Sequence, residues 1–110
     1  MDEKRRHERF CVELPASFSG RPSRAEGTIL NLSIMGGRVR TPFTVRKDDC
    51  LGVLIDIPKY ERPLYVSRAW VRWSNGRDFG MEFIEMELED QQRLAETIQA
   101  IQAAPGSETS

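Results

Sequence analysis

The fold of this chain is decided by the short stretch Asn31-Leu32-Ser33-Ile34-Met35-Gly36-Gly37. An apolar segment runs into it, and a second extended segment leaves it with two arginines. Because side chains alternate along an extended chain, Asn31 and Ser33 share one face and the apolar side chains take the other. The apolar residues that this alternation directs into a core are Leu30, Leu32 and Ile34. The stretch therefore presents two small hydrogen-bonding side chains beside two glycines.

The two glycines have two interpretations. Gly36 and Gly37 can adopt positive φ and leave room for a close approach to the backbone, which predicts a turn kept open for a ligand. Asn, Ser and Gly are also common in ordinary hairpin turns, and on its own the stretch favours that alternative.

Composition limits the kind of protein. The chain has 110 residues, 30% of them charged, and a formal net charge of −1, which predicts one small soluble domain and does not suggest strong nucleic-acid binding. Residues 1–46 hold nine Lys or Arg and five Asp or Glu, a net charge of +4. Residues 47–110 hold seven and twelve, a net charge of −5. The positive half surrounds the glycine turn and favours an anionic partner there.

Several classes of function are not indicated. Cys11 and Cys50 are far apart in sequence and are predicted to be reduced, buried thiols in a cytoplasmic protein. One histidine is too few for the common zinc sites, and no nucleophile–base pair indicates an enzyme, so no metal or other cofactor is expected. No apolar run reaches the roughly 20 residues of a membrane span, so membrane insertion is not expected.

Residue patterns place the elements. Residues 1–9 are polar and aperiodic and are predicted to be a flexible basic arm. Six segments of alternating hydrophobicity separated by turn signals then predict a small antiparallel barrel or sandwich. Their expected ranges are 10–18, 26–33, 38–44, 51–57, 64–73 and 79–83. Apolar residues at helical spacing predict an amphipathic helix at 89–103 that covers an open end or a face, and residues 105–110 read as a disordered tail.

Two tryptophans lie on the fifth predicted strand. Trp70 and Trp73 are three residues apart and therefore face opposite sides of a strand. Trp70 shares its face with two arginines, whereas Trp73 follows apolar residues. Alternation thus predicts that Trp73 lies in the core and Trp70 at the surface.

Two motifs in order carry a resemblance. The segment Arg5-Arg6-His7-Glu8-Arg9, followed by Asn31-x-Ser33-x-x-Gly36-Gly37, resembles the PilZ domain family, which is marked by an RxxxR arm and a (D/N)xSxxG turn. The resemblance runs from Lys4 to the predicted helix. It implies an all-β fold, a six-stranded antiparallel β-barrel with a C-terminal α-helix over residues 10–104, and binding of the bacterial second messenger cyclic di-GMP.

The resemblance also implies a set of site residues, and the chemistry agrees with it. Arginine forks suit phosphate oxygens and the acceptor edge of guanine, while amide and hydroxyl groups suit an edge of mixed polarity. Arg40 is preferred to Arg38 as a further contact, with a solvated strand face as the alternative for both. Asn31 stands where the family often has Asp, which removes an anionic acceptor and predicts lower affinity. The expected ligand-binding residues are Arg5, Arg6, Arg9, Asn31, Ser33, Gly36, Gly37, Arg40 and Trp73.

These residues predict a mechanism and leave alternatives. The arm is expected to be loose without ligand and to fold over cyclic di-GMP, which would change the surface seen by an unidentified downstream protein. A barrel that binds no nucleotide and acts as an interaction module, through residues 94–101 or a strand edge, is the alternative. A barrel that binds RNA or single strands is disfavoured by the balanced charge, so no DNA or RNA partner is expected.

Overall fold

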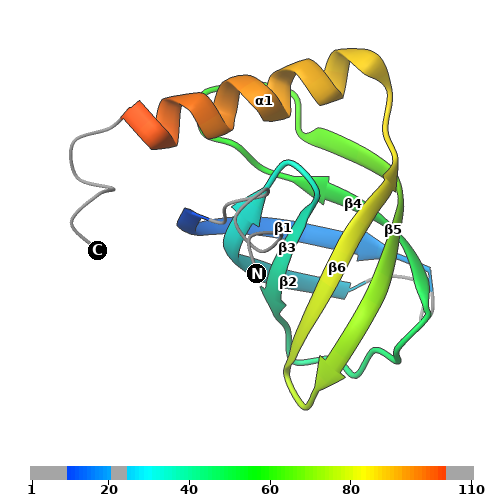
Figure 1. The fold of residues 1–110 in the computed structure, drawn as a ribbon. Coiled ribbons are helices and arrows are strands. Elements are labelled where there is room, and N and C mark those ends of the chain that lie inside the picture. Colours follow the sequence, from blue (N-terminus) through cyan, green and yellow to red (C-terminus); the bar gives the residue numbers. More distant parts are fainter. Residues whose placement is uncertain (1–9, 21–24, 104–110) are drawn as a thin grey trace, which may run out of the picture.

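The computed structural model describes residues 10–20 and 25–103, which form a closed six-stranded antiparallel β-barrel with one C-terminal helix (Figure 1). The strands follow the order β1-β2-β3-β6-β5-β4 around the barrel, and β1 pairs with β4 to close it. The predicted barrel is therefore confirmed, and the sandwich is wrong. The elements are β1 (Phe10–Ser19), β2 (Ala25–Ser33), β3 (Gly36–Arg40), β4 (Cys50–Ile55), β5 (Leu64–Asn75), β6 (Asp78–Glu85) and α1 (Leu88–Ala103).

Inward-facing side chains of all six strands fill the barrel, as alternation requires. Phe18 of β1 and Phe79 of β6 meet edge to face with ring centroids 5.7 Å apart. Around them lie β-branched and leucine side chains that are fully buried and leave no polar atom to satisfy. The fully buried large side chains are Phe79, Ile29, Leu32, Ile55, Leu64, Val39, Val53, Val66 and Val71.

The hairpin predicted at Asn75-Gly76 joins β5 to β6. Gly76 has a φ of 67°, the left-handed conformation that such a two-residue turn requires. By contrast, the third strand ends at Arg40 rather than at residue 44. Thr41 turns inward, is 2% exposed, and bonds to Arg77 and Glu26 carbonyls outside the β3 ladder, while Pro42 has no N–H to continue it.

The prediction that Leu30 and Ile34 lie in the core is wrong, one because of a β-bulge and the other because of the end of a strand. A register shift in the β2–β3 pair between Ile29 and Asn31 directs Ile29 and Leu32 inward, so Leu30 is only partly buried. Ile34 lies in the turn beyond β2 and is 51% exposed, so it is not a core residue.

The predicted burial of the two cysteines is also wrong. Cys11 and Cys50 are free and exposed. Cys50 begins β4, and its neighbour Leu51 takes the inward direction at 4% exposure, which leaves the thiol on the outer face. Alternation therefore governs these positions in spite of the general tendency of cysteine to be buried.

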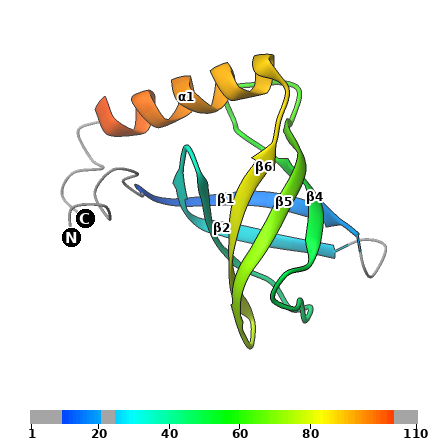
Figure 2. The ribbon, with the colours of Figure 1, turned by 45° about the vertical axis from the view of Figure 1, so that its right-hand side comes forward.

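Helix α1 crosses one end of the barrel, as Figures 1 and 2 both show. Leu94 and Ile98 are its buried anchors, at 3% and 8% exposure. Glu89 and Asp90 stand in its first turn, where the helix dipole favours negative charge. The prediction that the helix covers an open end is therefore confirmed. In the described part of the chain, no helix combines the length and the apolar character needed to cross a bilayer.

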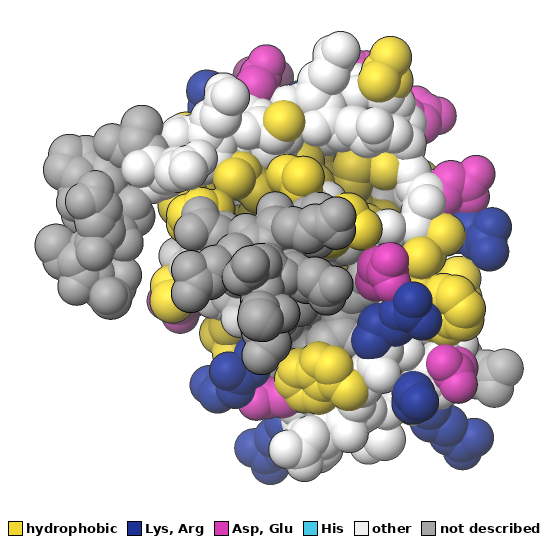
Figure 3. Space-filling model, viewed as in Figure 1, with side chains coloured by type: hydrophobic (Ala, Val, Ile, Leu, Met, Phe, Trp, Pro, Cys, Tyr) yellow, Lys and Arg dark blue, Asp and Glu magenta, His cyan; other side chains and the backbone are white. Residues whose placement is uncertain are grey.

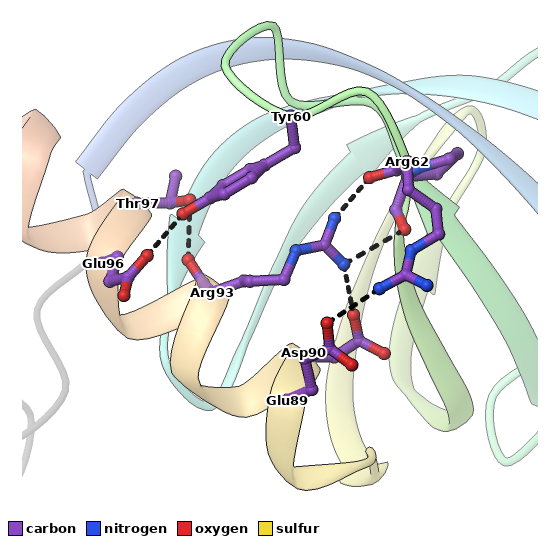
Figure 4. A network of polar contacts seen from close by, with 8 residues as sticks. Tyr60, Arg62, Glu89, Asp90, Arg93, Glu96 and Thr97 are labelled. Carbon is purple, nitrogen blue, oxygen red and sulfur yellow. Dashed lines mark hydrogen bonds and ion pairs between the residues drawn. The ribbon is translucent and has the colours of Figure 1, made fainter.

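A polar network ties the helix to the loop before β5 (Figure 4). Arg93 is 8% exposed, and its guanidinium donates to Asp90 at 2.6 Å and to the carbonyls of Arg62 and Pro63. The ring of Tyr60 lies 4.7 Å from that guanidinium, and its hydroxyl donates to Glu96 at 2.7 Å. The hydrogen bond to Glu96, with burial, raises the pKa of Tyr60. This network fixes α1 across the barrel end.

Candidate functional site

The turn between β2 and β3 is built by Ser33. Its side chain is 2% exposed. The hydroxyl accepts a hydrogen bond from the backbone N–H of Met35 at 3.1 Å and donates to the carbonyl of Gly36 at 3.3 Å. A serine used in this way closes a turn locally. The predicted site residue Ser33 therefore holds the shape of the turn in this structure.

The positive φ that the sequence suggested for Gly36 and Gly37 is wrong. Among the described glycines, positive φ occurs at Gly20 and Gly76, so neither Gly36 nor Gly37 uses that freedom. What approaches their backbone is the barrel itself. A Cβ at Gly36 would lie 2.0 Å from the Met81 carbonyl oxygen, and one at Gly37 would lie 2.4 Å from the Asn31 carbonyl oxygen. Both glycines therefore let neighbouring strands pack closely, and a contact between either glycine and a ligand stays a prediction.

Four residues line up across four strands on the barrel wall. Asn31 of β2 pairs with Arg38 of β3, Arg38 pairs with Gly80 of β6, and Gly80 pairs with Trp73 of β5. We call this set, Asn31, Arg38, Gly80 and Trp73, the transverse row. The side-chain oxygen of Asn31 accepts a hydrogen bond from the backbone N–H of Arg38 at 3.0 Å, which fixes the amide. The NH₂ group of Asn31 makes no hydrogen bond within the described residues.

Trp73 lies on the outer wall, so its predicted place in the core is wrong. It is 39% exposed, while Val71 is fully buried. The β5–β6 register shifts between Val71 and Trp73, and this bulge turns the strand so that the expected alternation breaks. The indole then lies against Gly80, where a Cβ would be 2.1 Å from its Nε1.

Trp70 is exposed as predicted, at 38%, but another side chain covers it. The Arg72 guanidinium lies 4.4 Å from the Trp70 ring centroid and pairs with Glu82 at 2.6 Å. Such a cation–π contact occupies the ring face. Of the two tryptophans, Trp73 is therefore the one whose ring belongs to the transverse row.

Two arginines of β3 share one carboxylate. Asp78 of β6 accepts from Arg38 Nη2 at 2.6 Å and stands 3.4 Å from Arg40 Nε. The hydrogen bond from Arg38 holds the pKa of Asp78 below its ordinary value; burial opposes this, and the charge of Arg38 and the contact with Arg40 add to it. Arg40 pairs with Asp78 beside the row, whereas Arg38 lies within it. Strand pairing therefore places Arg40 at the flank of the row, and its role as a ligand contact stays a prediction.

The structure sorts the predicted site residues into groups. Asn31 and Trp73 belong to the transverse row, and Arg40 flanks it. Ser33, Gly36 and Gly37 form the turn and the strand contacts beside it. The predicted arm residues Arg5, Arg6 and Arg9 lie outside the described residues.

Gly80 and Asp78 were missed by the sequence analysis, although the sequence contained a signal for both. A two-residue turn at residues 76–77 pairs Asn75 with Asp78 and Trp73 with Gly80, which simple counting from the hairpin provides. Pairing the residues outward from this turn places Gly80 beside Trp73. Asp78 then lies at the end of β6, opposite Arg40.

A hollow lies along the helix, away from the transverse row. Figure 3 shows a band of apolar side chains beneath α1. There, a groove of about 290 Å³ runs between the helix, β6 and the β2–β3 turn. Its lining residues are Ile34, Phe83, Ile84, Glu85, Met86, Gln91, Leu94 and Ala95. The described residues contain no cluster of His, Cys, Asp and Glu that could hold a metal ion.

Barrel, capping helix and transverse row together define a β-barrel domain with a polar and aromatic site on its wall. The family model of the PilZ domain matches residues 3–100. This chain belongs to the PilZ domain family. A comparison with curated proteins found no match.

Solved structures show the same fold. The Bacillus subtilis inhibitor of motility MotI/DgrA is 21% identical, with a TM-score of 0.73 over 87% of this chain and 50% of that one. The PilZ domain of CeSA from a cellulose-synthesizing bacterium is 11% identical, with a TM-score of 0.68 over 86% and 98%. Escherichia coli YcgR, solved in complex with c-di-GMP, is 11% identical, with a TM-score of 0.73 over 90% and 46%. The chain thus spans about half of MotI and of YcgR.

Proposed function

We propose that this protein is a receptor for cyclic di-GMP that acts as an adaptor in bacterial second-messenger signalling. Membership of the PilZ family supports this, as does the YcgR relative solved with c-di-GMP. The observation that carries the proposal is the transverse row, because it offers an exposed indole, a guanidinium and an oriented amide on one patch. Aromatic rings stack on bases, and guanidinium groups bind phosphate and guanine acceptors.

The proposal gives each predicted residue a role. Trp73 stacks on a guanine, Asn31 bonds to its edge through the amide, and Arg40 contacts a phosphate from the flank. Ser33, Gly36 and Gly37 act by holding the turn and its strands in place. Arg5, Arg6 and Arg9 on the arm close over the bound ligand, as the family motif implies, and residues 1–9 and 105–110 remain predicted flexible ends of a domain spanning 10–104.

The output then follows from the arm. Closure of a charged segment over an anionic ligand changes the surface that a downstream protein meets. We place the protein in the cytoplasm, where a second messenger of this kind is made and read. Ordering a segment of this length lowers the affinity, so a dissociation constant in the micromolar range is expected, on the order of −8 kcal/mol.

Calorimetric titration with cyclic di-GMP tests the function. The parent is expected to bind, and Arg5→Ala and Arg9→Ala are each expected to weaken binding by roughly 10-fold or more, the effect of losing one charge-assisted contact. Arg68→Ala is the matched control, because this arginine is exposed on β5 and pairs only loosely, at 3.7 Å, with Glu85. A parent that does not bind, or arm variants that bind as tightly as the parent, contradict the proposal.

A second function has one observation in its favour. The groove beneath α1 is lined by apolar side chains that reach the surface, such as Ile34 and Ile84, at 51% and 42% exposure. An interaction module without nucleotide would use this groove. A strand edge is the poorer candidate, because the described strands form a closed barrel with only short unpaired stretches. The same titration separates the two functions, since the module gives no heat with cyclic di-GMP.

A further inference from the structure

Arg38 has a position in the site that Arg40 does not share. Its strand pairs it with Asn31 on one side and with Gly80 on the other, and Trp73 follows Gly80. Gly80 has no side chain, and the Trp73 indole takes the space where one would lie. A planar base stacked on the indole would therefore extend toward the amide and the guanidinium together.

Asp78 fixes the orientation of the Arg38 side chain. The 2.6 Å contact between Asp78 Oδ2 and Arg38 Nη2 is much shorter than the 3.4 Å contact with Arg40. The Arg38 side chain is 40% exposed, against 60% for Arg40. Its Nε is buried and has no hydrogen-bond partner among the described residues. That buried donor is not reachable from outside, but Asp78 engages only Nη2 of the guanidinium. The exposed part of the Arg38 side chain is therefore held in place and can still meet a ligand.

The three side chains of the row would each contribute differently to the recognition of a base. An indole stacks on any base, because every base has a π-face. An amide both donates and accepts, so it discriminates weakly. A guanidinium only donates, and it matches the O6 and N7 acceptors of guanine, whereas adenine presents a donor at N6.

We propose that Arg38, held by Asp78, is the residue that makes this site specific for guanine, by donating to the O6 and N7 edge. The inference rests on the proposed function, because it assumes a guanine nucleotide on the transverse row. Asp78 is a positioning residue in this account, since it acts through Arg38 and does not touch the ligand.

Calorimetry with two ligands tests the inference on the full chain. The probes are cyclic di-GMP and its 7-deazaguanine analogue, which lacks the N7 acceptor. The parent is expected to bind the analogue roughly 10-fold more weakly, the value of a good arginine–guanine contact. Arg38→Ala is expected to bind cyclic di-GMP roughly 10-fold more weakly than the parent. In this variant the analogue is expected to bind at most about 3-fold more weakly than cyclic di-GMP, which is a third of the factor expected for the parent.

Two further variants give controls. Arg40→Ala is expected to weaken binding of both ligands by the same factor, because a phosphate contact does not sense N7. Asp78→Asn keeps the size of the side chain and frees Arg38, so it is expected to at least halve the penalty for the analogue, on the order of a twofold change or more. The Asp78→Asn measurement also keeps the inference testable if Arg38→Ala fails to fold.

The outcomes separate two failures. A parent that does not bind cyclic di-GMP overturns the proposed function and this inference together. A parent that binds, with Arg38→Ala and Asp78→Asn both showing the full 7-deaza penalty, overturns only the assignment of Arg38. A reduced penalty in both variants, with Arg40→Ala unchanged, supports it.

Discussion

The indole of Trp73 lies directly against the Cα of Gly80, so closely that a Cβ at residue 80 would fall 2.1 Å from the indole Nε1. The two residues pair across β5 and β6 on the far side of a bulge. Gly80 thus fixes where the aromatic ring of the site lies. Because the ring packs against a residue without a side chain, a single methyl group added at residue 80 would displace it.

Gly80→Ala is therefore expected to displace the indole and to weaken cyclic di-GMP binding about as much as Trp73→Ala does. The loss of a stacked base is worth about 1–3 kcal/mol. Titration followed by tryptophan fluorescence measures it. Gly76→Ala is the control, because nothing lies within 4 Å of its Cβ, although its φ of 67° makes the variant strained. Equal binding by Gly80→Ala and the parent would contradict the role of the ring.

Asn31→Asp is expected to tighten cyclic di-GMP binding by roughly 3- to 10-fold, because a carboxylate forms stronger hydrogen bonds to the N–H groups of guanine. The acceptor for the Arg38 backbone N–H, at 3.0 Å, is retained in this variant. Gln99→Glu makes the same change from amide to carboxylate at an exposed position of α1 and is expected to leave binding unchanged. A weaker complex with Asn31→Asp would show that the amide donates to the ligand.

Ser33→Ala is expected to destabilise the ligand-free protein by about 1–3 kcal/mol, since a buried hydroxyl with two hydrogen bonds is removed. Urea unfolding without nucleotide measures this loss. Ser67→Ala removes an exposed hydroxyl that donates to the Glu85 carbonyl at 3.0 Å, and it is expected to cost less. Should Ser33→Ala affect only ligand binding, the turn would not depend on this side chain.

Arg93→Met is expected to destabilise the fold by roughly 3–5 kcal/mol, because it leaves the buried Asp90 without its partner. Arg62→Ala removes the partner of Glu89 at 2.9 Å, but both side chains are about two-thirds exposed. That control is expected to cost under about 1 kcal/mol. Urea denaturation compares the two, and similar losses would mean that the network at α1 contributes little.

Asp78 is expected to make the free energy of unfolding fall at acid pH. Its pKa is below the ordinary value in the folded protein, chiefly through the hydrogen bond from Arg38. The stabilisation it gives is therefore present above the unfolded pKa and is lost as pH falls through the folded pKa. Unfolding midpoints measured from about pH 7 to about pH 3 are expected to fall less steeply in Asp78→Asn than in the parent. Glu89→Gln, at an exposed ion pair, is expected to follow the parent, and parallel curves for Asp78→Asn would contradict the prediction.

The number and order of the elements could be predicted because each is a local pattern. Alternation identified six strands, the Asn75-Gly76 turn identified a hairpin, and helical spacing identified α1. Alternation failed where strands distant in sequence impose a shift in register. The bulges near Ile29 and near Trp73 come from pairing with β3 and β6, and no local pattern contains that information.

The site was only partly predictable for the same reason. Asn31 and Trp73 were predicted from the motif and the family resemblance, but the row that joins them exists only once β3 and β6 are paired. Ser33 and Gly36 were interpreted as facing a ligand, because a hydroxyl and a glycine have the same sequence signature whether they meet a ligand or the backbone. Arg38 and Arg40 are equivalent by alternation, and only the strand order separates them.

The complete ring of strands has a consequence for how such a domain can communicate. Every described strand has a hydrogen-bonded neighbour on each side, although β1 pairs with β4 only over Ala16–Ser19. Only short stretches of main chain are therefore open to the addition of a strand from another polypeptide. The wall is also protected from the edge-to-edge association that leads to aggregation. If the proposed function holds, a partner would mainly meet side chains and loops, and the barrel would serve as a rigid support.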